Sequence, residues 1–191
     1  ANISEGLKKL LDLCDFFFFF TEIDRIDQTL CRFAQRNRPF ESLNLRDFYD
    51  IIDEIAFTST NMYQARLIQV KEEKEDVLYK ESNALGIKSP SVLIIRGMPE
   101  FILPKCRYML RADSGEKMKM NETNMKTIES KIAEWSAMGH RIVCFAKKVI
   151  TEEAMEKRSE ENYDFPKWFN GECNRLVFAG MIGFMDHPKP W

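Results

Sequence analysis

The chain has 191 residues and a formal net charge of −2; 45% of its residues are hydrophobic and 30% are charged, as in an ordinary globular domain. Because no basic block stands out, nucleic acid is not expected as the main partner. The apolar run Phe16–Phe20 is far shorter than the roughly 20 residues that span a bilayer, so we expect no membrane insertion by this segment.

The cysteines and histidines argue against a metal site. Five cysteines are scattered along the chain without a CxxC pair, and there are only two histidines. A zinc site needs clustered ligands of these types. Free thiols in a reducing, cytoplasmic compartment are the simplest interpretation.

The first predicted element is an amphipathic helix, in which Leu7, Leu10, Leu11 and Cys14 recur with helical spacing. Phe16–Phe20 comes directly after it. An extended run of five phenylalanines would point to both faces, so the run is either buried on both sides or a patch for a partner. Burial is the interpretation that the usual location of Phe favours.

Two further helices are predicted before the first strand. One spans Ile26–Ala34, with Asp24 and Asp27 at its start, where carboxylates complement the helix dipole. A short one spans Leu45–Ile52, and Asp53–Phe57 is expected to be extended.

A β-hairpin is predicted next. The polar turn Thr58–Asn61 separates two apolar runs, and Tyr63–Val70 alternates as a strand does. The charged stretch from Lys71 to Pro90 is predicted to be a surface insertion.

The central stretch combines a strand with a helix start. Val92–Ile95 suits a buried strand, Arg96 ends it, Gly97 lacks a side chain, and Pro99 suits the first turn of a helix. This arrangement can hold a phosphate against exposed backbone N–H groups. The alternative is an ordinary connection with a surface arginine. Pro104 should shorten or kink the helix.

The rest of the chain alternates between helices and strands. The expected elements are a helix over Met125–Trp135 capped by Gly139, a strand over Arg141–Val149, a short helix from Thr151 to Arg158, an aromatic loop over Asn162–Gly171 and a strand over Leu176–Met185. We therefore predict an α+β fold in which helices flank a mostly antiparallel sheet.

Several motifs then resemble the nucleotide-binding domain of P-type cation-transporting ATPases, most closely the sodium/potassium and proton/potassium pump group. They are EIAFTSTNMYQ (Glu54–Gln64), IIRGMPEFILPKC (Ile94–Cys106), GHRIVCFAKK (Gly139–Lys148) and LVFAGMIGFMDHPKP (Leu176–Pro190). DRIDQTLCRFA (Asp24–Ala34) is similar to the family's D-x-[ST]-E-x-A-L helix start. Four motifs in the family's order make the resemblance specific.

The resemblance implies a single nucleotide-binding domain over residues 1–185, with residues 186–191 as a hinge toward a phosphorylation domain absent from this chain. Such a domain holds the adenine of ATP on the cytoplasmic side of a membrane protein and presents the γ-phosphate to the phosphorylation domain. The implied partners are therefore ATP, with Mg in the full-length parent, and the phosphorylation and actuator domains.

Ten residues are implied to bind nucleotide: Asp27, Phe57, Ser59, Met62, Gln64, Arg96, Gly97, Arg141, Asp186 and Lys189. In this assignment Phe57 stacks on adenine, as a flat aromatic face suits a purine, although a plain core role is the alternative. Arg96 stands where the family has a lysine. Arg141 matches the family arginine that contacts the phosphates, which a guanidinium can bind in a bidentate way.

The chain also departs from the family pattern. Met62 replaces a lysine of the turn, Arg96 keeps the charge of a lysine but not its shape, Asp27 is shorter than glutamate, and His187 interrupts the hinge motif. These changes leave open a second interpretation, a nucleotide-binding-impaired domain of a degenerate pump paralogue with a regulatory or scaffolding role. A third is an interaction module that uses the phenylalanine run or the insertion.

No independent catalytic activity is expected. The chain contains neither the D-K-T-G-T phosphorylation motif of the family nor a Walker-type phosphate loop, and no nucleophile motif accompanies its histidines. On this basis it can bind nucleotide but cannot form the phosphoenzyme by itself.

Overall fold

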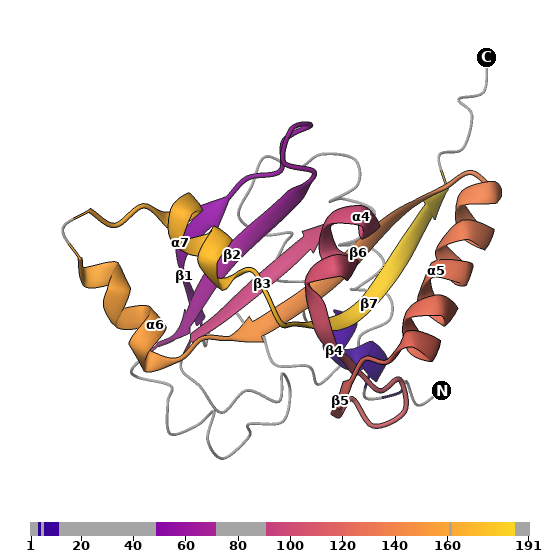
Figure 1. Cartoon of the computed structure of the whole chain (residues 1–191), viewed down its shortest axis with the longest axis horizontal. Coiled ribbons are helices and arrows are strands. Elements are labelled where there is room, and N and C mark those ends of the chain that lie inside the picture. The colour runs from indigo at the N-terminus through magenta and orange to yellow at the C-terminus, as the bar shows by residue number, and fades with distance from the viewer. Residues whose placement is uncertain (1–3, 5, 12–48, 72–90, 161, 186–191) are drawn as a thin grey trace.

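The computed structural model describes residues 4, 6–11, 49–71, 91–160 and 162–185. Its centre is a seven-stranded twisted sheet in the order β1-β2-β3-β6-β7-β4-β5 (Figure 1). All neighbouring strands are antiparallel except β4 and β7, which are parallel. The strands are β1 Tyr49–Ile55, β2 Tyr63–Val70, β3 Ser91–Gly97, β4 Cys106–Leu110, β5 Lys117–Lys119, β6 His140–Val149 and β7 Leu176–Met185. This confirms the predicted α+β class.

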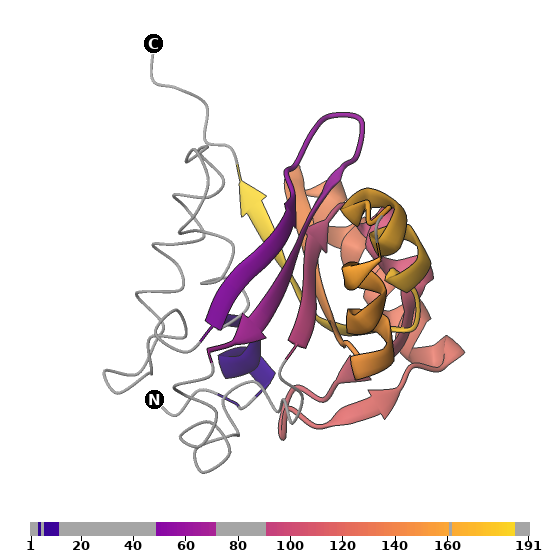
Figure 2. The ribbon, with the colours of Figure 1, turned by 90° about the vertical axis from the view of Figure 1, so that its left-hand side faces the viewer.

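The labelled helices lie on one face of the sheet, as the view along its edge in Figure 2 shows. They are α4 Pro99–Ile102, α5 Glu122–Ala137, α6 Glu152–Glu156 and α7 Phe165–Glu172. A further short helix spans residues 6–11. Among the described residues, no helix has both the length and the apolar character that crossing a membrane requires.

Local chemistry explains where these helices begin and end. Pro99 occupies the first turn of α4, where a missing N–H is harmless, and Pro104 limits the continuation of this helix to the 3₁₀ turn Leu103–Lys105. Thr151 caps α6 by accepting a hydrogen bond from the Ala154 N–H. Gly139 comes after α5 with φ +81°, the left-handed conformation that glycine adopts without a steric penalty.

The main core lies between the sheet and these helices. Alternate residues of the central strands point into it, including Leu67, Leu93, Ile95 and Cys144, all fully buried. Phe169 of α7 closes the core from the helical side. The opposite face of β2 and β3 also carries buried side chains, so both faces of the sheet centre are covered.

The prediction of a helix over Leu45–Ile52 was wrong for the residues that the structure describes. Residues from Tyr49 onward form β1, which pairs with β2 from Tyr49↔Val70 to Ile55↔Ala65. A register shift between Ile51 and Asp53 interrupts the alternation, because a bulge adds one residue. Tyr49 and Ile52, the part of the predicted helical stripe that the structure describes, therefore belong to a bulged strand.

The prediction of a loop over Asn162–Gly171 was also wrong, because α7 occupies most of it. Pro166 lies in the first turn of this helix, where proline is tolerated. Phe165 and Phe169, one helical turn apart, are both buried against the core. Tertiary burial thus stabilises a helix in a segment that contains a proline.

The other predicted strands and helices agree with the structure where it describes them, although β3 continues through Arg96 to Gly97 and the first helix is described only over residues 6–11. The predictions for Phe16–Phe20, for the helix over Ile26–Ala34, for the insertion up to Pro90 and for the hinge at residues 186–191 lie outside the described residues. Strands β4 and β5 were not predicted, because Pro104 and the polar residues around Gly115 obscure their short apolar pattern.

Candidate functional site

A cavity of about 440 Å³ lies beyond the carboxyl end of β3, between β6, α4 and α5. This volume is within the range of small-molecule pockets. Its walls come from three separated parts of the chain: Phe57, Arg96, Gly97, Met98, Pro99, Glu100, Ile132, Ser136, His140, Arg141, Ile142 and Val143.

The cavity exists because neighbouring strands have different lengths. β3 ends at Gly97, which pairs with Cys144 of β6. β6 extends four residues further in this direction, to His140, and over this part it pairs with β7 on its other side. The chain after Gly97 turns into α4 instead of continuing as a strand, so a space remains beside β6.

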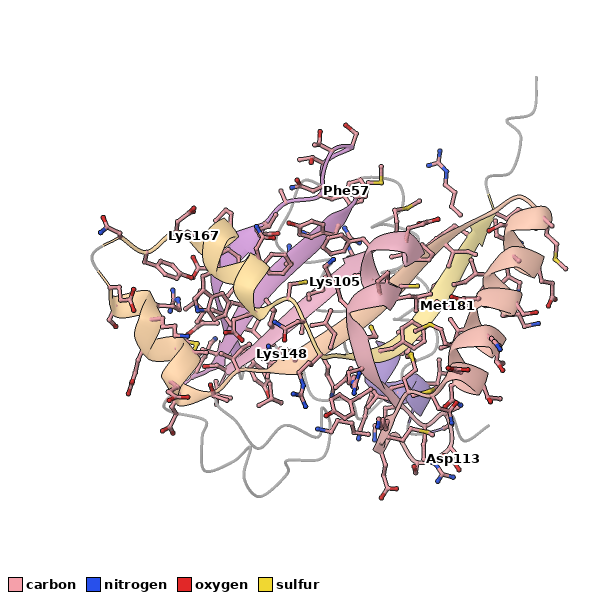
Figure 3. The ribbon with its side chains drawn as sticks, in the orientation of Figure 1. Phe57, Lys105, Asp113, Lys148, Lys167 and Met181 are labelled. Atoms are coloured by element: carbon pink, nitrogen blue, oxygen red, sulfur yellow. The ribbon has the colours of Figure 1, made fainter. Side chains whose placement is uncertain are left out.

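The β1–β2 hairpin brings Phe57 to this space. Its tip projects from the sheet in Figure 1, and the labelled Phe57 in Figure 3 lies at the base of the tip. Met62 in the turn accepts a hydrogen bond through its carbonyl from the Met98 N–H at 3.0 Å, which ties the turn to the start of α4. The Phe57 side chain is 50% exposed, so its ring is accessible to a ligand.

A chain of polar contacts orients Arg96. Its Nε donates to Oε1 of Gln64 on the neighbouring strand at 2.7 Å, and Gln64 Nε2 donates to Oε1 of Glu54 at 2.7 Å. Arg66 donates to the same Glu54 oxygen through its Nη2 at 2.8 Å. Arg96 is only 7% exposed in these surroundings, so its guanidinium is held in place before any ligand arrives.

Gly97 is required by close packing of the protein itself. A Cβ atom at this position would lie 2.8 Å from both the Met62 carbonyl oxygen and the Tyr63 Cβ. The Tyr63 ring stacks on Phe101 of α4 with a 4.0 Å centroid separation, so this contact also fixes the start of α4. The assignment of Gly97 to the nucleotide site, which the family resemblance implies, remains a prediction.

The charges of the cavity are mixed. Arg96 and Arg141 are cationic, and Glu100 in the first turn of α4 is anionic. His140 packs edge-on against Trp135 at a 6.3 Å centroid separation, and its buried Nδ1 has no hydrogen-bond partner within the described structure. Across the described ranges, no group of three or more His, Cys, Asp or Glu side chains could hold a metal ion.

The structure brings together four of the ten residues assigned from the sequence: Phe57, Arg96, Gly97 and Arg141 line the cavity. Three others lie nearby without lining it. Gln64 is buried and orients Arg96, whereas Ser59 and Met62 are exposed in the hairpin turn. The remaining three, Asp27, Asp186 and Lys189, lie outside the described residues.

Sequence analysis missed Glu100, Ser136 and His140 as cavity residues. Glu100 belongs to the Ile94–Cys106 motif but was not among the residues assigned to the site. Ser136 and His140 lie on either side of the predicted helix cap Gly139. The signal that could have found them was the end of a predicted helix directly before a predicted strand.

The structure is thus an α+β domain with a cavity at one end of its central sheet. A family model described as P-type ATPase, cytoplasmic domain N, matches residues 23–191. The chain therefore belongs to this family, and the resemblance seen in its motifs is confirmed.

Curated relatives agree with this family. The chain is 27% identical over 165 residues to calcium-transporting ATPase 1 of Yarrowia lipolytica, a match that covers 84% of this chain and 16% of the relative. It is 26% identical over 145 residues to the sodium/potassium-transporting ATPase subunit alpha-3 of Rattus norvegicus and of Homo sapiens, with coverage of 72% and 12%. The chain thus spans less than a fifth of the length of these relatives.

Proposed function

We propose that this domain binds ATP in the cavity beyond β3, holding the adenine against Phe57, on the cytoplasmic side of a cation-transporting ATPase. The γ-phosphate is then presented to a phosphorylation domain of the parent protein, with Mg bound to the phosphates. The observation that carries the proposal is the convergence of Phe57, Arg96, Gly97 and Arg141, from three separated segments, around one cavity.

The geometry supports different roles in ATP binding for Phe57 and for the two arginines. Phe57 offers a half-exposed aromatic face, and base–aromatic stacking contributes roughly 1–3 kcal/mol per base in nucleic-acid complexes. Arg96 is oriented by Gln64 and Glu54, which reduces the entropy cost of binding an anion. Arg141 is exposed and lines the cavity, and a guanidinium can bind phosphate oxygens in a bidentate way.

Glu100 limits where the phosphates can lie. Its carboxylate would repel a polyphosphate placed directly over the start of α4. The triphosphate is therefore expected to extend from Arg96 toward Arg141 and solvent.

The test is an ATP titration followed by amide NMR on the 191-residue chain, with Phe57→Ala and Arg96→Gln as variants. We expect shifts clustered around Phe57, Gly97 and Arg141, and at least tenfold weaker binding in Phe57→Ala. Lys126→Gln, which removes an exposed cation from α5 away from the cavity lining, is the control and should bind as the unmodified chain does.

Two results would contradict the proposal. Shifts that avoid the cavity would place ATP elsewhere. A well-dispersed spectrum without shifts at several millimolar ATP would favour the alternative, a nucleotide-binding-impaired domain with a regulatory or scaffolding role in a degenerate pump paralogue.

A further inference from the structure

A second cavity lies at the other end of the sheet and is not part of the proposed ATP site. It has a volume of about 630 Å³ and lies between the end of β6, the start of β7, the β4–β5 hairpin and the helix over residues 6–11. Five cationic residues line it: Lys9, Lys117, Lys147, Lys148 and Arg175. Among the described residues Glu116 is the only carboxylate in its wall.

Three of these cations interact with neutral groups. Lys9 Nζ donates to the Gly115 carbonyl oxygen at 3.0 Å, Lys117 Nζ lies 4.8 Å from the centroid of the Tyr108 ring, and Arg175 Nη2 donates to the Tyr108 hydroxyl at 3.1 Å. Lys148, in contrast, forms an ion pair with Glu172 at 2.9 Å. The positive charge of Lys9, Lys117 and Arg175 is therefore not neutralised by a carboxylate in the described structure.

Tyr108 shows the effect of this positive field. It lies between Lys117, which faces its ring, and Arg175, which donates to its hydroxyl. The hydrogen bond and the charge of Arg175, with smaller contributions from Lys117 and Arg107, lower the pKa of the Tyr108 phenol. Nearby groups thus favour a negative charge at this point of the cavity wall.

The backbone of Arg175 is strained. Its φ is +52°, a left-handed conformation that is uncommon for a residue with a long side chain. Such strain persists only where the surroundings impose it, and it often occurs at ligand sites. At Arg175 it accompanies a guanidinium placed beside Tyr108 at the mouth of a cationic cavity.

We propose that this cavity binds a compact polyanion with two or more phosphate groups, held by Lys9, Lys117 and Arg175. Three cations on separate elements match more than one negative charge, and a guanidinium can bind a phosphate in a bidentate way. A free oligophosphate and a bisphosphorylated lipid headgroup share this chemistry. The site does not depend on the proposed ATP site.

The first experiment titrates the 191-residue chain with inorganic pyrophosphate, followed by amide NMR and calorimetry. We expect shifts at Tyr108, Lys117 and Arg175, and at least tenfold weaker binding in the Lys117→Gln/Arg175→Gln variant. Because the attraction is electrostatic, binding should also weaken between roughly 50 and 300 mM salt. Pyrophosphate should leave the amide resonances of Arg96, Gly97 and Arg141 unshifted, which separates this site from the ATP site.

The matched control removes the same charge elsewhere. Lys126 on α5 and Lys167 on α7 are both exposed, and Figure 3 shows Lys167 at the opposite end of the molecule from Asp113 in the β4–β5 turn. Lys126→Gln/Lys167→Gln should change the affinity less than twofold. The charge-preserving Lys117→Arg variant should retain binding.

Vesicles distinguish the two sources of phosphate. Binding to phosphatidylcholine vesicles that contain phosphatidylinositol 4,5-bisphosphate, with competition by pyrophosphate, would identify a lipid headgroup; pyrophosphate binding without vesicle binding would identify a free oligophosphate.

Three outcomes would overturn the proposal. In the first, pyrophosphate shifts only Arg96, Gly97 and Arg141. In the second, the control variant loses as much affinity as Lys117→Gln/Arg175→Gln. In the third, neither probe binds at a phosphate concentration of about 10 mM, which exceeds the dissociation constants of weak sites.

Discussion

Single residues at the proposed ATP site have two kinds of role, contact with a ligand and packing of the protein. Gly97 illustrates the second, because the Met62 carbonyl oxygen and the Tyr63 Cβ leave no room for a methyl group. Gln64 likewise acts through a neighbour, since it holds Nε of Arg96 and is itself held by Glu54. Gly97 lines the cavity but has no side chain, and Gln64 does not line it. Both residues therefore act by positioning the cavity wall.

Gly97→Ala should therefore destabilise the domain. Forcing a methyl group within 2.8 Å of backbone and Cβ atoms requires a backbone shift, and overpacking of this kind costs about 1–3 kcal/mol. Urea unfolding would measure the loss. Gly171→Ala in α7 is the matched control: nothing lies within 4 Å of its Cβ position, and alanine favours a helix, so stability should stay equal or rise. Equal losses in both variants would contradict this explanation of Gly97.

Met62 offers a gain-of-function test of the ATP proposal. Its side chain is 50% exposed in the hairpin turn next to the cavity, at the position where the motif resemblance implies a lysine. Met62→Lys adds a cation that can approach a nucleotide phosphate, so we expect ATP affinity to rise several-fold at low salt, by about 1 kcal/mol.

Calorimetry at two salt concentrations would check the Met62→Lys variant. Met62→Gln, which adds polarity without charge, is the control and should leave the affinity unchanged. A Met62→Lys affinity that does not change, while Phe57→Ala abolishes binding, would show that the phosphates do not pass the hairpin turn.

At the scale of elements, helix ends set the geometry of the cavity. α5 forms one wall, and its first turn is closed by a capping box: Asn124 N–H donates to Asn121 Oδ1 at 2.8 Å, and Asn121 N–H donates to Asn124 Oδ1 at 3.4 Å. Its last turn carries Ser136, which lines the cavity together with His140.

Asn121→Ala should destabilise the domain by about 1 kcal/mol, the usual effect of losing a good N-cap. Asn124→Ala should destabilise it less, because it removes only the longer of the two hydrogen bonds and places a strong helix former inside α5. Chemical denaturation of the two variants would measure the difference. Similar losses would show that the cap acts through the reciprocal bond rather than through Asn121.

At the scale of the whole molecule, two buried thiols, Cys144 and Cys173, and the half-buried thiol of Cys106 make stability depend on pH. Burial raises the pKa of Cys106 and of Cys144 to about 12 and that of Cys173 to about 11. In the unfolded chain the pKa of a thiol is about 8.5, as in model peptides. The thiols therefore favour the folded state fully below this pH and progressively less above it.

We expect the free energy of unfolding to fall as the pH rises from about 9 toward 11. Urea unfolding at several pH values would measure the slope. The Cys106→Ala/Cys144→Ala variant is the control: its absolute stability will differ, but its slope should be shallower, since two of the titrating groups are gone. An identical slope in the variant would contradict the assignment to these thiols.

Much of the secondary structure can be inferred from local patterns. The strand over Tyr63–Val70 was predictable because its side chains alternate between apolar and polar, and most of β3 because Val92–Ile95 is an unbroken apolar run. α5 was predictable because its apolar residues repeat with helical spacing. The helix α7 was not, because Pro166 suppresses the local signal and only contact of Phe165 and Phe169 with the core reveals it.

The α+β class, the family and the chemistry available at the proposed ATP site could be inferred from the residues alone, because periodicity and motifs are local properties of the chain. Which of those residues meet depends on the tertiary structure. Phe57, Arg96 and Arg141 converge because β3 stops at Gly97 while β6 continues, and the cations around Tyr108 converge because β4 pairs with β7. Strand pairing joins residues far apart in the chain, and no local pattern records which strands will pair.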